Sequence, residues 1–211
     1  MKTIKYMAVA ATLMIVGLAM PDRAHAQLFP RGYINVDWQF NGTVANDFVE
    51  KGNGWGMNFE GGGYLGQSQR VGLGLFLAYS TNNKYVPRQT LVLNNQAALT
   101  TDQQHSIFQI PFGVSARVRF LKGSLFEPYI GAKVGTVYSK ISSFYSTVEL
   151  YGETWGFYVA PEIGVTIMPF GDTGIGFHVA AYYGYGTNDL KILKYSINGL
   201  KNVGFRVGIA F

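Results

Sequence analysis

The sequence contains no cysteine, few charged residues and a single long apolar run, and each shortage excludes a class of protein. Without cysteine there is no disulfide framework, no thiolate metal site and no lipid-anchored residue behind an export signal. Charged residues make up 14% of the chain, against 15% aromatic residues and 27 glycines, which is charge-poor for a soluble domain. The basic residues behind the formal charge of +5 are scattered, so we expect no nucleic-acid partner.

The long apolar run lies close to the N-terminus. It covers residues 6–20, about 15 residues, whereas a helix that crosses a membrane needs roughly 20. Lys2 and Lys5 precede it, and Ala24-His25-Ala26 follows with the small residues that signal peptidase recognises. We therefore predict a cleaved signal peptide over residues 1–26 and one exported domain over residues 27–211.

The exported part alternates between two kinds of connection. Period-two patterns predict eight strands, at residues 32–41, 54–66, 69–80, 105–120, 125–139, 154–168, 174–187 and 199–211. The links at 67–68, 121–124 and 169–173 are tight turns, whereas those over 42–53, 81–104, 140–153 and 188–198 are long and polar. An even number of strands, joined by short turns on one side and long loops on the other, is typical of outer-membrane barrels.

Each predicted strand has one bulky apolar face and one face of small or polar residues. The charges of the strands fall on the small-residue face, which in a soluble barrel would point outward. We therefore expect the apolar face to meet lipid and the charges to pair inside a lumen barely wide enough for its own side chains. A narrow ion path is the alternative. This predicted interior network comprises Asp37, Glu60, Arg70, Arg117, Arg119, Glu127, Lys133, Glu162 and Arg206.

The end of the chain carries a family resemblance. The last predicted strand exposes Phe205, Val207, Ile209 and Phe211 on one face and stops on an aromatic residue. With the signal peptide and the two-faced strands, this ending resembles the small eight-stranded bacterial outer-membrane barrels, such as the membrane domain of OmpA and the OmpX-type proteins. The resemblance implies an all-β, antiparallel up-and-down transmembrane barrel with periplasmic termini and extracellular loops. It also implies contact with lipid and lipopolysaccharide, and recognition of the terminal strand by the barrel-assembly machinery.

Some small barrels of this kind modify lipid A, and catalysis would need a nucleophile beside a histidine and an orienting acid. The exported part holds two histidines, His105 and His178. The deacylase pattern of histidine with serine two residues later is absent, because Ala180 occupies that place. We therefore expect no enzyme, no cofactor and no metal site.

The long loops are then the predicted functional surface. Residues 81–104 and 188–198 are longer than simple connectors and mix apolar with basic residues. We predict a structural, accessory or adhesive protein that binds a partner through these loops or its outer wall, and a protein in a larger outer-membrane complex is one such partner. The alternatives are a narrow channel for small solutes or apolar molecules and, less favoured, a lipid A-modifying enzyme. The two loops could equally extend the strands as a ridge of hairpins. The candidate contact residues are Lys84, Tyr85, Arg88, Leu91, Leu93, Lys191, Lys194 and Tyr195.

Overall fold

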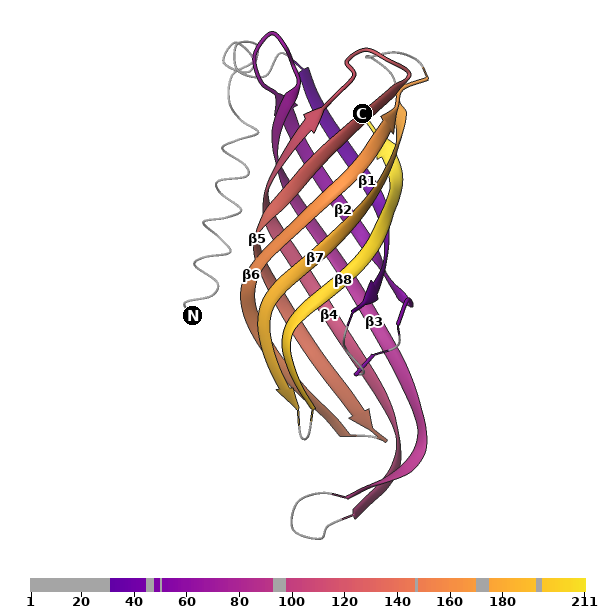
Figure 1. Cartoon of the computed structure of the whole chain (residues 1–211). Helices are drawn as coiled ribbons and strands as arrows, with labels where there is room; N and C mark the ends of the chain where they lie inside the picture. The colour runs from indigo at the N-terminus through magenta and orange to yellow at the C-terminus, as the bar shows by residue number, and fades with distance from the viewer. Residues whose placement is uncertain are drawn as a thin grey trace.

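The computed structural model is a closed barrel of eight antiparallel strands, in which each strand pairs with the next and β8 closes on β1 (Figure 1). It describes residues 31–44, 48–49, 51–92, 98–146, 148–169, 175–192 and 195–211. The predicted signal peptide lies outside these residues, among which no helix has the length and apolar character to cross a membrane. The strands are β1 (Arg31–Thr43), β2 (Gly54–Tyr64), β3 (Val71–Val92), β4 (Ala98–Arg119), β5 (Phe126–Tyr145), β6 (Val148–Ile167), β7 (Gly176–Ile192) and β8 (Tyr195–Ala210).

The two ends of the barrel differ. The brief β2–β3, β4–β5 and β6–β7 connections lie at the end where the chain terminates, drawn at the top of Figure 1. Long hairpins leave the opposite end. The predicted fold class and strand number are confirmed.

The predicted long loops over 81–104, 140–153 and 188–198 were wrong. The β3–β4 ladder continues to Val92↔Ala98, the β5–β6 ladder to Tyr145↔Val148 and the β7–β8 ladder to Ile192↔Tyr195. The outer face of these segments does not meet hydrocarbon and is mostly polar, so they lack the bulky apolar face by which a membrane strand is recognised in a sequence. The ridge of hairpins, left open above, is what the structure contains.

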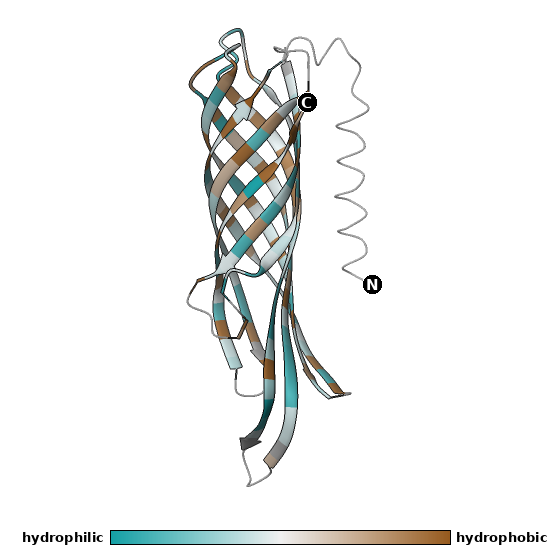
Figure 2. Cartoon of the chain, turned by 90° about the vertical axis from the view of Figure 1, so that its right-hand side faces the viewer, coloured by the Kyte–Doolittle hydropathy of each residue, from teal (hydrophilic) through white to brown (hydrophobic). Residues whose placement is uncertain are grey.

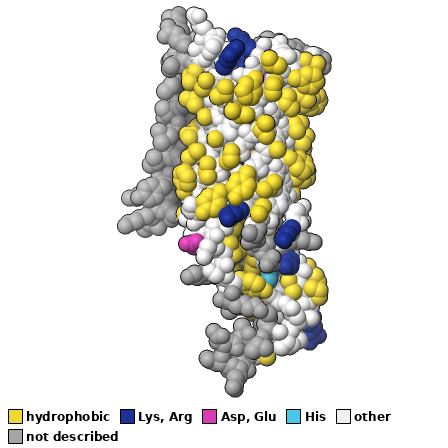
Figure 3. All heavy atoms as spheres, in the orientation of Figure 1, with side chains coloured by type: hydrophobic (Ala, Val, Ile, Leu, Met, Phe, Trp, Pro, Cys, Tyr) yellow, Lys and Arg dark blue, Asp and Glu magenta, His cyan; other side chains and the backbone are white. Residues whose placement is uncertain are grey.

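The two faces of the strands point as predicted. Bulky apolar side chains face outward on all eight strands and form an apolar belt, one face of which is seen in Figure 3; the alternation of hydropathy along the strands is seen in Figure 2. Toward the hairpin end the belt finishes in aromatic side chains, which form a girdle of the kind found at a membrane interface. This girdle comprises Trp38, Phe40, Trp55, Tyr79, Tyr138, Trp155, Tyr183 and Tyr185.

Beyond the girdle the strands continue as a projecting structure that we call the crown, formed by the described residues 82–92, 98–107, 139–146, 148–154, 187–192 and 195–200. It contains an apolar cluster, here called the cap. Phe48 and Val49, from the connection between β1 and β2, fold into the cap and are buried. The other members are Ile107, Ile141, Leu190, Ile192, Ile197 and Leu200.

Candidate functional site

The lumen holds eight charged side chains of the predicted network, and all of them are buried. Since successive strand residues point to opposite faces, the residues facing inward from β1, β2, β4, β5, β6 and β8 converge on one interior. Four carboxylates meet four cations there, namely Asp37, Glu60, Glu127 and Glu162 with Arg117, Arg119, Lys133 and Arg206.

The centre of the lumen is a chain of ion pairs built around Lys133. Its Nζ lies 2.8 Å from Oε2 of Glu60 and 3.1 Å from Oε2 of Glu162. Each carboxylate also binds an arginine. Arg117 Nη2 lies 2.5 Å from Glu60 Oε1, and Arg206 Nη1 pairs with Glu162 Oε2. Because each carboxylate bridges two cations, the network spans the lumen from β2 to β8 and leaves little room for a path through it.

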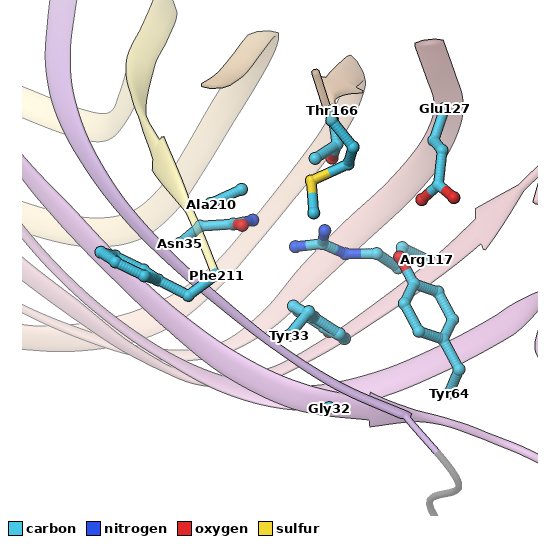
Figure 4. A pocket seen from close by; sticks show the side chains of 10 residues that line it. Gly32, Tyr33, Asn35, Tyr64, Arg117, Glu127, Thr166, Ala210 and Phe211 are labelled. Atoms are coloured by element: carbon cyan, nitrogen blue, oxygen red, sulfur yellow. The ribbon is translucent and has the colours of Figure 1, made fainter. Parts of the chain in front are cut away.

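A second pair closes the end near the short turns. Arg119 Nη1 donates to Glu127 Oε2 over 2.9 Å and Arg119 Nε donates to the carbonyl of Gln69 over 2.6 Å. The guanidinium lies 3.9 Å from the ring centroid of Tyr64, a cation–π contact. Beside it lies a cavity of about 30 Å³, between Tyr33, Tyr64, Arg117 and Phe211 (Figure 4).

His178 connects a third set of groups. Its Nδ1 lies 2.7 Å from Asp37 Oδ1, and its Nε2 lies 2.6 Å from the hydroxyl of Tyr129, which donates to Glu162 Oε1 over 3.1 Å. Gly164 makes room for Tyr129, since a Cβ there would lie 2.7 Å from the tyrosine ring. An acid, a histidine and a hydroxyl in line resemble a catalytic set, but all three side chains are buried within the network. The arrangement fixes side chains and offers a substrate no access.

Arg70 was wrongly predicted to join the interior network. Its side chain is exposed, because the residue precedes β3 in the short turn where alternation of faces has not begun. Without it the lumen carries four acids and four bases, so each charge has a counter-charge available.

His105 lies under the cap. Its ring stacks on Phe48 with 4.3 Å between centroids, and its Nδ1 lies 2.8 Å from the Phe48 carbonyl oxygen. Burial, together with the charge of Lys84 on the facing strand, lowers the pKa of His105 below its ordinary value of 6.5. The role of Phe48 had no sequence signal, because it lies in a polar stretch between two strands.

The candidate contact residues of the crown are only partly described. Tyr85 and Arg88 are exposed on β3, and Lys84 and Tyr195 are half-buried. Leu91 and Lys191 lie on strands, but their side chains are outside the described part, as are Leu93 and Lys194 entirely.

The last strand, β8, completes the barrel by pairing with β1. The N–H and C=O of Phe211 pair with Ile34 of β1 over 2.8 and 3.0 Å. Phe205, Val207, Ile209 and Phe211 all point outward into the belt. The profile of the outer membrane protein beta-barrel domain matches residues 9–211. The chain belongs to this family.

Membership makes this a β-barrel of the bacterial outer membrane, and its wall is in contact with membrane lipid. Among curated proteins none matches the chain.

Similar solved structures share the architecture at low sequence identity. Neisserial surface protein A is 14% identical, with a TM-score of 0.48 over 85% of this chain and 95% of its own. Ail, the attachment invasion locus protein of Yersinia pestis, is 12% identical, with a TM-score of 0.45 over 85% and 97%. The outer membrane protease OmpT of Escherichia coli is 10% identical, with a TM-score of 0.49 over 85% and 96%.

Proposed function

We propose that this protein is a non-enzymatic surface barrel that binds a macromolecular partner through its crown, and that its lumen is closed. The observation that carries the proposal is the length of the strands. A β-strand crosses a membrane in about 9–11 residues, whereas β3 and β4 each have 22. About half of each strand therefore stands outside the membrane, where anchoring does not require it.

The orientation of the barrel is part of the proposal. Short turns and the chain terminus share one end, and the crown occupies the other. In outer-membrane barrels the short turns are periplasmic and the long connections are extracellular. We therefore place both termini in the periplasm and the crown outside the cell, in reach of lipopolysaccharide and of other cells. The terminal aromatic strand is proposed as the signal for barrel assembly.

The interior supports a non-enzymatic role and a closed lumen. His178 and Asp37 are fully buried among ion pairs, and the apolar cap lies between the network and the outside. A narrow channel is the second candidate. Glu60 binds Arg117 and Lys133 at once, and these ion pairs would have to separate before a solute could pass.

A shortened crown tests the proposed function. A variant in which two-residue turns replace residues 87–102 and 143–150 joins Val86 to Gln103 and Ser142 to Tyr151. Both pairs already exist, so the barrel and the cap are retained. Two measurements compare this variant with the intact protein: stoichiometric co-purification from outer membranes in mild detergent, and adherence of the bacteria to epithelial monolayers. We expect at least one to be lost. If both are unchanged while the shortened barrel still shows the gel mobility of a folded barrel, the proposed function is wrong.

A further inference from the structure

Within the crown, strands β3 to β6 form one sheet with two edges, and one of these edges is guarded. On the β3 edge, Asn53 Nδ2 donates to the Asn83 carbonyl over 2.6 Å, and the Asn83 N–H donates back to Asn53 Oδ1 over 3.3 Å. Pro87 lacks a donor, and the register shifts between Val86 and Gln89. A side chain bound to the edge, a proline and a bulge are the means by which proteins prevent another strand from adding to an edge.

Between Glu149 and Trp155 the β6 edge shows none of these features among the described residues. Its pairing with β7 begins only at Tyr158↔Gly186, and its register with β5 is constant up to Val148. The N–H of Phe157 points to the β7 side, where it donates to Thr187 Oγ1. Since backbone directions alternate, the N–H and C=O groups of Glu149, Tyr151 and Glu153 face the same edge. Among the described residues, these groups make no backbone hydrogen bond to another strand.

Asn188 marks the point where β7 departs from β6. It is fully buried, and its Nδ2 donates to the carbonyls of Val137 and Thr154, each over 3.2 Å. Gly156 and Gly186 leave space for its amide, since a Cβ at either would lie within 2.8 Å of Oδ1. Oδ1 itself has no hydrogen-bond partner. The buried amide of Asn188 therefore binds the backbones of β5 and β6 at the level where the pairing of β6 with β7 stops.

The side chains along this edge favour a partner segment of positive charge. The outer face carries Glu149, Tyr151 and Glu153, and the inner face carries Val148 and Leu150. Lys140 Nζ lies 3.3 Å from Glu149 Oε1 and 4.6 Å from the ring centroid of Tyr151, so it offsets one carboxylate. Exposed Asp189 stands on the β7 side. Among these described side chains three carboxylates face one ammonium group. A strand added to an edge places its side chains directly opposite such rows.

We propose that the β6 edge from Glu149 to Trp155 is the docking site for an extended, basic segment of a partner polypeptide, which adds as a further strand. The segment alternates apolar residues, opposite Val148 and Leu150, with basic residues, opposite Glu149 and Glu153. This inference rests on the proposed function, since it names the surface and the chemistry of the partner. Backbone hydrogen bonds supply affinity and the alternating rows supply specificity.

The test uses a synthetic peptide that alternates valine with lysine, and the full barrel in nanodiscs of zwitterionic lipid. Tyr151→Pro removes one N–H from the open edge without touching the β5 ladder. Tyr85→Pro is the matched control, because Tyr85 is similarly exposed and its N–H faces the guarded edge (64% against 60% exposed). We expect Tyr151→Pro to weaken binding about tenfold, the value of one backbone hydrogen bond, and Tyr85→Pro to leave it unchanged. Bound peptide should also slow amide hydrogen exchange at Glu149, Tyr151 and Glu153.

Other outcomes overturn the inference. If the wild type and Tyr151→Pro bind the peptide equally, the β6 edge is not the docking site. If a peptide with glutamate in place of lysine binds equally well, the site does not select a basic segment. Glu153→Lys, which leaves the backbone intact, must also weaken binding. Concentration-dependent self-association that Tyr151→Pro abolishes would make a second copy the occupant instead. If the shortened crown loses its partner while Tyr151→Pro does not, the proposed function stands and this inference fails.

Discussion

Glu162 shows how this lumen accommodates charge that water does not reach. Its carboxylate accepts from Lys133, Arg206 and Tyr129, so three neighbours depend on one side chain. Burying ions is costly, and the pairs need not stabilise the barrel more than apolar residues would. Removing one partner is different, because it leaves the remaining charges buried and only partly compensated.

We therefore expect Glu162→Gln to destabilise the barrel by about 3–5 kcal/mol, although the two side chains have nearly the same shape. The measurement is urea unfolding in lipid vesicles, followed by tryptophan fluorescence. Glu149→Gln is the control, since Glu149 pairs with Lys140 at a site where both side chains are 34% exposed, and its cost should stay below about 1 kcal/mol. Equal costs for the two variants would show that the lumen is hydrated.

At the scale of elements, β8 combines both environments in one strand. Arg206 points into the network and its neighbours Phe205 and Val207 point into lipid. Val207→Arg should cost about 2–4 kcal/mol, because it sets a charge against hydrocarbon near the middle of the strand. Gln104→Arg, on the exposed face of β4 within the crown, should cost almost nothing. Unfolding measured in the same vesicles compares the two, and tolerance of Val207→Arg would reverse the assignment of the faces.

The segment that carries Phe48 should respond to pH. The pKa of His105 is lowered in the folded protein, so the unfolded chain binds more protons and the cap loses stability as the pH falls below 6.5. Lys84, on the facing strand, opposes protonation as well. Amide hydrogen exchange of Phe48 and Val49, corrected for the intrinsic rate, should accelerate on acidification. His105→Gln should remove this dependence; if it persists in the variant, another group controls the cap.

At the scale of the whole molecule, the proposed closure of the lumen rests on two features, the ion-pair network and the cap. We expect no steady conductance when the protein is inserted into planar bilayers. Glu60→Ala and Arg117→Ala each remove one side of the central pairs and are the variants most able to open a path. Steady conductance in the wild type, altered by either substitution, would favour the channel over the closed barrel.

The sequence by itself determined the barrel and the content of its lumen. The faces of the strands could be assigned without coordinates because lipid requires one unbroken apolar face, so charges are confined to the other. Beyond the girdle the strands no longer meet lipid, so the sequence pattern no longer shows where they run or which face points inward. Arg70, in a turn, and the crown strands, whose outer face is mostly polar, were both misassigned for this reason.

Only the tertiary structure decided which charges pair, what closes the lumen and where an edge is left open. Glu60 and Lys133 lie 73 residues apart in the chain, yet barrel closure and register bring their atoms within 2.8 Å. Phe48 enters the cap because the crown strands surround an apolar space that it can fill. The open edge of β6 exists because β7 leaves it at Asn188. Each of these depends on contacts between distant segments, which local sequence patterns do not record.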